Sequence, residues 1–233
     1  MRSLSVTTTL VVGMLASGCS LFDMAVACDD ETPCPSGGVC GASGFCDDGT
    51  TTDGGGEQPV TRTATFTSLW SVTFFGSGNP RTDPEFMSFC IQGEFSTTNG
   101  NQKCALGFDD DDIRATLEDA TIIDTELSLT WDHWAVGASG TVVIGTHNTS
   151  APPATFQDLD DVTVGRQDEL FDEGEQKWVS VGTAVGEELR DGSTRGFVLG
   201  PAPDADQSWY GYALGASQTG PPALRVTYEV IEE

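Results

Sequence analysis

The stretch I-D-T-E-L-S-L-T-W, residues 123–131, decides the fold class of this chain. Apolar side chains alternate in it with polar ones: Ile123, Leu127, Leu129 and Trp131 against Asp124, Glu126, Ser128 and Thr130. A period of two is the spacing of a β-strand that buries one face and leaves the other in water. The stretch therefore predicts a strand whose apolar face, Ile123 included, packs on a core.

The same period appears on both sides of this stretch. Apolar and polar residues alternate over 64–74 and again over 224–230. Weaker strand candidates are 86–95, 104–108, 141–146, 177–182, 195–199 and 208–214. Gly, Pro, Asn and Asp, which favour turns, occupy the gaps. So many short strands predict an all-β domain.

Helical signals in the chain are short. Asp112 can cap a turn in which Ile113 and Leu117 share one face, and a second turn is expected at 184–189. A long helical period is missing from the sequence, which argues against a sheet of alternating strands and helices. We therefore predict an antiparallel, jelly-roll-like β-sandwich over residues 61–233.

The N-terminus has the features of an export signal. One cation, Arg2, precedes an apolar run over 10–15, and small residues lead to Cys19. The run is shorter than the about 20 residues that span a bilayer. It resembles the bacterial lipoprotein signal, which implies cleavage of residues 1–18, acylation of Cys19 and a tether over 19–27. The alternative is an ordinary secretory signal with an incidental cysteine.

Residues 28–46 form a predicted cysteine-rich knot. Cys28, Cys34, Cys40 and Cys46 are separated by five residues each, in a segment with almost nothing to bury. Two disulfides are expected because an exported chain is oxidised, and all three pairings remain open. Zinc is the alternative, although its ligands favour shorter spacings. The segment resembles small growth-factor-like knots of bacterial surface lipoproteins. A flexible linker follows over 47–60.

Two further cysteines lie within the predicted sandwich. Cys90 and Cys104 flank a loop that contains Asn99-Gly100, a hairpin signal. A disulfide between adjacent strands is expected, and a pair of buried free thiols is the alternative.

The charge of the chain restricts its partners. It has 10 Lys and Arg against 36 Asp and Glu, a formal net charge of −26. Such a field repels nucleic acid and anionic lipid head groups, so membrane attachment should depend on acyl chains at Cys19. The charge serves solubility, or part of it binds divalent cations.

Two acidic groups are candidate calcium ligands. They are Asp109, Asp110, Asp111 and Asp112, and then Asp158, Asp160 and Asp161. Calcium takes six to eight oxygen ligands from loops, and a cation would relieve the repulsion between neighbouring carboxylates. Neither group has EF-hand spacing, and a solvated acidic loop is the alternative. No other cofactor is expected.

Aromatic and histidine side chains are the remaining binding candidates. Trp134 and Trp209 are expected to be exposed because they lie off the register of their neighbours, and exposed aromatic faces bind sugars. His133 and His147 are candidates for a shared ligand site if the sandwich brings them together. The alternative is two hydrogen-bonded histidines at strand ends. Motifs for hydrolases, nucleotide binding and zinc proteases are missing, so an enzyme is not expected.

Several segments resemble known β-sandwich modules when taken in order. They are 129–134, 139–148, 195–203, 209–212 and 222–228. Together they resemble a module found near the ends of actinobacterial phage tail proteins and in some exported bacterial proteins. The closing strand is similar to that of DNRLRE-type secreted domains. The resemblance implies an extracellular structural or carbohydrate-binding module without assigned catalytic residues.

The sequence thus predicts an exported, membrane-anchored surface protein, in the outer membrane if the cell has two. Its sandwich would present a binding site to a surface polysaccharide or a protein partner. A structural subunit of a surface layer, fibre or appendage is the alternative, and an extracellular hydrolase is a third. The ligand and the oligomeric state are left open.

Overall fold

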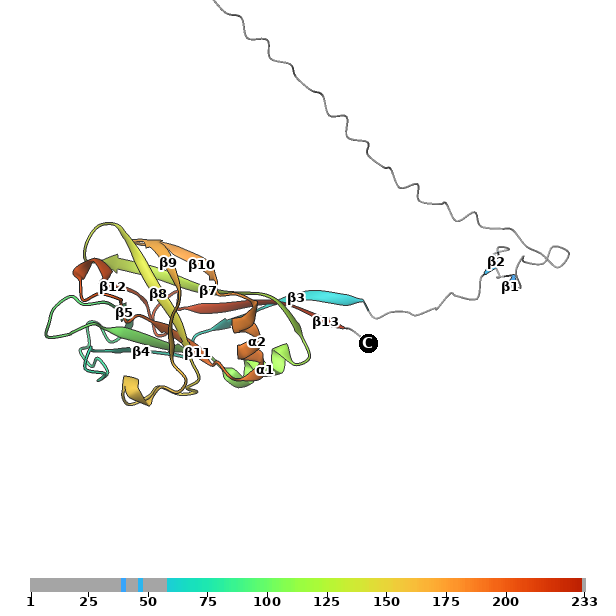
Figure 1. Cartoon of the computed structure of the whole chain (residues 1–233), viewed down its shortest axis with the longest axis horizontal. Coiled ribbons are helices and arrows are strands. Elements are labelled where there is room, and N and C mark those ends of the chain that lie inside the picture. Colours follow the sequence, from blue (N-terminus) through green and yellow to red (C-terminus); the bar gives the residue numbers. More distant parts are fainter. Residues whose placement is uncertain (1–38, 41–45, 48–57, 232–233) are drawn as a thin grey trace, which may run out of the picture. The chain divides into compact units, whose positions relative to one another are not determined.

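Two antiparallel sheets build the domain that follows the predicted linker. The computed structural model describes residues 39–40, 46–47 and 58–231. The chain divides into two units at Gly56, and the second of them holds both sheets (Figure 1). In the first unit, the described residues form one antiparallel pair, β1 (Val39–Cys40) with β2 (Cys46–Asp47).

The first sheet is organised around the long strand β7. Its strand order is β3 (Pro59–Thr67), β13 (Ala223–Ile231), β7 (Thr121–Trp134), β12 (Gly211–Leu214) and β5 (Phe89–Gln92). β7 also pairs with β10 (Gln176–Ser180), along the edge opposite to the one that pairs with β13. The stretch that predicted the fold therefore lies at the centre of a sheet, where both of its edges are hydrogen-bonded.

The second sheet packs on the first. Its strand order is β4 (Trp70–Phe74), β6 (Lys103–Gly107), β11 (Gly196–Leu199), β8 (Ser139–His147) and β9 (Thr163–Asp172). Between β3 and β13, only the β8–β9 and β12–β13 connections stay within one sheet. All other connections cross between the sheets. The prediction of an antiparallel β-sandwich is confirmed.

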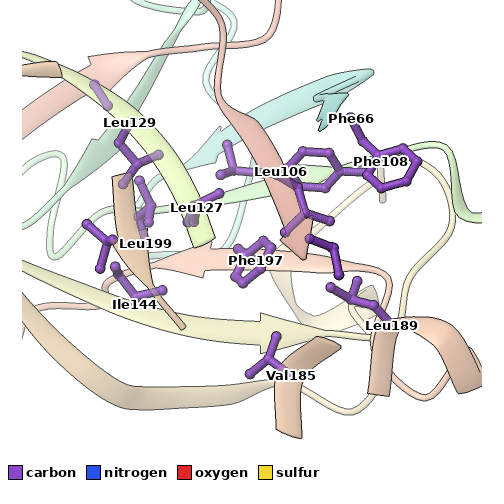
Figure 2. Packing of buried hydrophobic residues seen from close by; sticks show 14 of the residues in the cluster. Phe66, Leu106, Phe108, Leu127, Leu129, Ile144, Val185, Leu189, Phe197 and Leu199 are labelled. Atoms are coloured by element: carbon purple, nitrogen blue, oxygen red, sulfur yellow. The ribbon is translucent and has the colours of Figure 1, made fainter. Parts of the chain in front are cut away.

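Two short helices close part of the core. They are α1 (Asp110–Leu117) and α2 (Thr183–Asp191), which pack against each other, while α2 also packs against β7. Both lie where the sequence predicted helical turns. Val185 and Leu189 of α2 join the side chains of both sheets, among them Leu127 of β7 and Phe197 of β11 (Figure 2). Each such fully buried side chain stabilises the fold by about 1.5–3 kcal/mol.

Cys90 and Cys104 form the expected disulfide. Their strands are consecutive in the chain and are joined by an isolated bridge between Gly93 and Gln102. Beyond this bridge β5 enters the first sheet and β6 the second. The disulfide is therefore a link between the two sheets and not a bond across one hairpin ladder.

One residue of the opening stretch departs from its predicted face. Ile123 is 45% exposed, whereas Ile122 is 4% exposed and belongs to the core. The β13–β7 register shifts where Thr227 pairs with Asp124 and Tyr228 with Ile122. Ile123 has no opposite residue there, and this bulge reverses the alternation on either side of it. The prediction that Ile123 is buried is wrong for this reason.

Strand β9 was not predicted from the sequence. Its burial is almost uniformly low, and Phe171 is its one fully buried side chain. Among the described strands it pairs only with β8, at the edge of the sheet, so little apolar alternation is required of it. The predicted strand over 86–95 is also shorter than expected, because only 89–92 pair in the sheet.

Candidate functional site

An aromatic pocket opens on the outer face of the first sheet. Tyr212 lies opposite His133 in the β12–β7 ladder, while its neighbour Ala213 is fully buried in the core. Because side chains alternate along a strand, Tyr212 and His133 face away from the core. Together with five other residues they surround a cavity of about 330 Å³. The lining residues are Arg81, Phe86, Phe95, Asn99, His133, Tyr210 and Tyr212; we call this cavity the aromatic pocket.

Four segments that are distant in sequence supply this lining. Arg81 and Phe86 come from the β4–β5 connection. Phe95 and Asn99 come from the β5–β6 connection, and Tyr210 stands immediately before β12. A volume of this size is at the small end of ligand pockets, which hold about 300–1,000 Å³.

The rings of the aromatic pocket hold one another in place. Tyr212 packs against Phe86 at 6.2 Å and against Phe89 at 4.7 Å between ring centroids. Its centroid is 5.2 Å from that of His133. Phe95 packs on Tyr210 at 5.2 Å and is still 51% exposed. The pocket thus offers pre-arranged aromatic surface to a ligand.

Arg81 is buried beside this aromatic surface with its charge already paired. Its side chain is 8% exposed, and it donates to both carboxylate oxygens of Asp83, at 2.9 and 2.8 Å. A further donation reaches Gln102 Oε1 at 2.7 Å. The guanidinium holds the pKa of the Asp83 carboxyl below its usual value. The positive charge of Arg81 is therefore used within the protein.

Carboxylates stand around the aromatic pocket. Glu173 Oε2 lies 3.3 Å from His133 Nδ1 and accepts a hydrogen bond from the Trp134 backbone nitrogen. Asp132 and Glu85 are exposed and directly precede the lining residues His133 and Phe86. Burial raises the pKa of Tyr212, and the negative charges of Asp132, Glu173 and Glu85 raise it further. The pocket therefore combines an apolar interior with a negative rim.

Tyr210 and Asn99 add hydrogen-bonding groups to the apolar lining. Tyr210 is 6% exposed, and burial raises the pKa of its hydroxyl. A hydrogen bond with Arg81 acts in the opposite direction on the same hydroxyl. Flat aromatic faces beside a few polar groups are the combination that binds sugar rings and other ligands with both apolar and polar faces.

The tryptophan predictions have different outcomes. Trp134 is 2% exposed, stacks on Trp131 and donates from Nε1 to the Phe171 carbonyl at 3.1 Å. The prediction that Trp134 is exposed for ligands is therefore wrong. Trp209 is partly exposed in the 3₁₀ turn η3 (Gln207–Trp209), but it does not line the aromatic pocket. Its neighbour Tyr210 does.

The two histidines are not brought together. His133 lies near the connection from β7 to β8, which crosses between the sheets, whereas His147 is the last residue of β8. Ser139 at the start of β8 and His147 at its end are eight residue steps apart, about 26 Å of extended strand. His147 is 1% exposed; its Nε2 donates to the Leu106 carbonyl and its Nδ1 accepts from Thr149. Burial lowers its pKa to about 4, so it is a neutral structural residue.

The first acidic group begins a helix. Asp109 is the N-cap of α1 and accepts from the Asp112 backbone nitrogen at 3.1 Å. Asp110 and Asp111 pair with Arg114 at 2.9 and 2.7 Å. Carboxylates at a helix N-terminus are stabilised by the helix dipole and by such pairs, which offsets their mutual repulsion without a metal.

The second acidic group is partly used in local turns. Asp158 accepts from the backbone and hydroxyl of Thr155, and Asp161 has a positive φ of 47°. Within the described part of the chain, no three His, Cys, Asp or Glu side chains come together as metal ligands. Calcium binding by either group stays a prediction.

The remaining predicted residues lie outside the described side chains. Cys19, Cys28 and Cys34 fall outside the described residues, as do the signal and tether. Cys40 and Cys46 are described through their backbone, where they are opposite each other in the β1–β2 pair. Over the residues that the structure describes, none of the helices has the length and hydrophobicity to cross a membrane.

Of the seven lining residues, the sequence predicted only His133 as a ligand-site candidate; it missed Arg81, Phe86, Phe95, Asn99, Tyr210 and Tyr212. Phe95 carried a usable signal, because it stands between the polar residues Glu94 and Ser96, beyond the end of β5 at Gln92. Arg81 carried none, since a single arginine in a loop is most often a solvated charge.

A larger hollow of about 440 Å³ lies between α1 and α2. It is lined by Arg114, Ala115, Glu118, Asp119, Arg190 and Asp191. Arg114 and Arg190 are paired there with neighbouring aspartates, and no aromatic ring lines it. Its open, charged surface offers a ligand little apolar contact, so the smaller aromatic pocket is the better candidate site.

No protein-family model matches the chain, and no curated protein matches it.

Proposed function

We propose that this chain is a lipid-anchored cell-surface protein whose β-sandwich binds a sugar residue of a surface glycan in the aromatic pocket. One observation carries the proposal: four aromatic rings, from three connections and one strand, surround a cavity of about 330 Å³ beside hydrogen-bonding groups. The rings are arranged before any ligand arrives, so binding does not have to order them. The anchor rests on the signal-like N-terminus and on Cys19.

The binding experiment uses the full-length chain in detergent micelles. It is titrated with purified polysaccharides and cell-envelope preparations, once with calcium and once with a chelator. Phe95→Ala removes a half-exposed ring of the pocket, and we expect it to weaken binding about tenfold, equivalent to about 1.4 kcal/mol. Leu69→Ala is the control, because Leu69 is 64% exposed and does not line the pocket.

Three outcomes separate the alternatives. Binding lost with Phe95→Ala and kept with Leu69→Ala supports the glycan site. Equal binding by both variants places the glycan elsewhere and overturns the pocket assignment. If no glycan binds and the protein assembles as its concentration rises, the structural-subunit alternative is favoured.

The anchor has its own test. Mass spectrometry of the protein from a bacterial host with a lipoprotein-processing system should find acyl chains on Cys19 at a new N-terminus. Cys19→Ser should leave the chain unacylated and free of the membrane fraction. An uncleaved or unacylated Cys19 would overturn the anchor without affecting the binding proposal.

A further inference from the structure

The charges around the aromatic pocket are unbalanced. Arg81 contributes +1, and Asp83, Glu85, Asp132 and Glu173 contribute −4, which leaves −3 while His133 is neutral. Arg81 is the only Lys or Arg among the residues that line the pocket. The formal net charge of the whole chain, −26, acts in the same direction. A ligand that enters therefore meets a negative field.

The aromatic lining favours the same ligand charge. Aromatic rings attract cations to their faces, because the ring quadrupole is negative there. The protein itself shows this interaction at the pocket, where the Arg81 guanidinium carbon lies 4.9 Å from the Phe86 ring centroid and 5.2 Å from that of Phe75. The rings of Phe95, Tyr210 and Tyr212 have no such cation over them among the contacts of the described residues.

Glu173 is placed to receive a cation at the rim. Its Oε2 atom already contacts the His133 ring at 3.3 Å, and its side chain remains 43% exposed. The backbone nitrogen of Trp134 donates to the same oxygen, which holds the carboxylate over the pocket residue His133. An ammonium group on a ligand whose ring lies on Tyr212 would meet this carboxylate and the nearby Asp132.

We infer that the aromatic pocket selects a ligand with a positively charged amine, an amino sugar with a free ammonium group, over neutral and acidic sugars. This inference rests on the proposed function and adds the charge of the ligand to it. An acidic sugar would bring a carboxylate against Glu173 and Asp132, where like charges repel. An N-acetylated sugar would have the same ring shape without the charge.

The test compares three sugars and one simple cation by NMR titration of the full-length protein in detergent. Glucosamine, N-acetylglucosamine and glucuronic acid are used at a pH where the amine is protonated, with tetramethylammonium as the fourth probe. We expect glucosamine to bind about tenfold more tightly than N-acetylglucosamine. The preference should decrease as salt is added, because exposed charges are screened. Glucuronic acid should not bind.

Two variants locate the effect. Glu173→Gln keeps the size of the side chain and should reduce the ratio of glucosamine affinity to N-acetylglucosamine affinity severalfold. Glu169→Gln is the matched control, since Glu169 pairs with Lys177 and does not line the pocket. Equal preferences in Glu173→Gln and the parent protein would overturn the assignment of the charge to this rim.

The remaining outcomes separate this inference from the proposed function. Equal or tighter binding of N-acetylglucosamine overturns the charge selection and keeps the glycan site. Binding of tetramethylammonium without any sugar keeps the charge selection and overturns the glycan ligand. Absence of binding by all four probes overturns both.

Discussion

The indole rings of Trp131 and Trp134 stack with their centroids 4.5 Å apart, although the two residues lie three positions apart on one strand. In a regular strand such residues point to opposite faces. The β12–β7 register shifts here: Tyr212 pairs with His133 and Ala213 with Trp131, so Asp132 has no opposite residue. This bulge turns Trp134 into the core and leaves His133 at the aromatic pocket.

Trp134→Ala should destabilise the domain. The ring is 2% exposed, and its removal leaves a large cavity beside Trp131, which typically costs about 3–5 kcal/mol. Urea unfolding followed by circular dichroism measures the loss. Leu170→Ala is the control, because Leu170 is 59% exposed and its truncation should cost little. A similar small cost for both variants would contradict the burial of Trp134.

The disulfide between the two sheets should contribute measurably to stability. Cys90 and Cys104 are 14 residues apart, and closing a loop of this length stabilises the folded state by about 3 kcal/mol through the unfolded chain. The double variant Cys90→Ala, Cys104→Ala should lose about this free energy of unfolding. The difference from the parent protein should largely disappear when both are unfolded in reductant. A difference that persists unchanged would assign the effect to packing of the sulfur atoms instead.

Acid should destabilise the domain through His147. Burial lowers the pKa of this side chain from 6.5 to about 4 in the folded state, so the unfolded chain binds the proton more tightly. The stabilisation is complete above the unfolded pKa of about 6.5 and is lost as the pH falls toward about 4, a total of about 3 kcal/mol. The free energy of unfolding should therefore fall over this range in the parent protein.

His147→Gln isolates this contribution, because it removes the titrating ring while keeping a polar side chain. The carboxylates titrate alike in both proteins, so the difference between their pH profiles reports the histidine. If the free energies of unfolding of the two proteins change in parallel between about pH 4 and pH 6.5, protonation of His147 costs nothing in the folded state. That result would contradict the burial of the ring.

The N-cap of α1 should be worth a modest free energy. Asp109 accepts a hydrogen bond from the Asp112 backbone nitrogen, and replacing such a cap by alanine costs about 1 kcal/mol. Asp111→Ala is the control within the same turn, because its pair with Arg114 is exposed and should contribute less than about 0.5 kcal/mol. Thermal unfolding of both variants measures which of them loses more stability. Equal losses of stability would argue against the capping role of Asp109.

The sequence by itself determined the fold class and most of the elements. Alternation over 123–131 and 224–230 specified strands, because a half-buried strand needs one apolar face in every second position. Asp and apolar residues at helical spacing predicted α1, and the turn signal between Cys90 and Cys104 favoured their disulfide over two free thiols. These features depend on residues that are close in the chain, so local sequence patterns predict them.

Only the tertiary structure decided the site. Phe86, Phe95, His133 and Tyr212 meet because two connections, the bulged strand β7 and its neighbour β12 converge on one sheet face. These segments are far apart in the sequence, and only strand pairing brings them together. The burial of Trp134 depends on the bulge at Asp132, which has no opposite residue in β12. The weak apolar alternation of β9 depends on its place at the edge of the sheet. A bulge or an edge position is defined by the pairing with a neighbouring strand. The hydrophobic pattern within one strand therefore does not predict it.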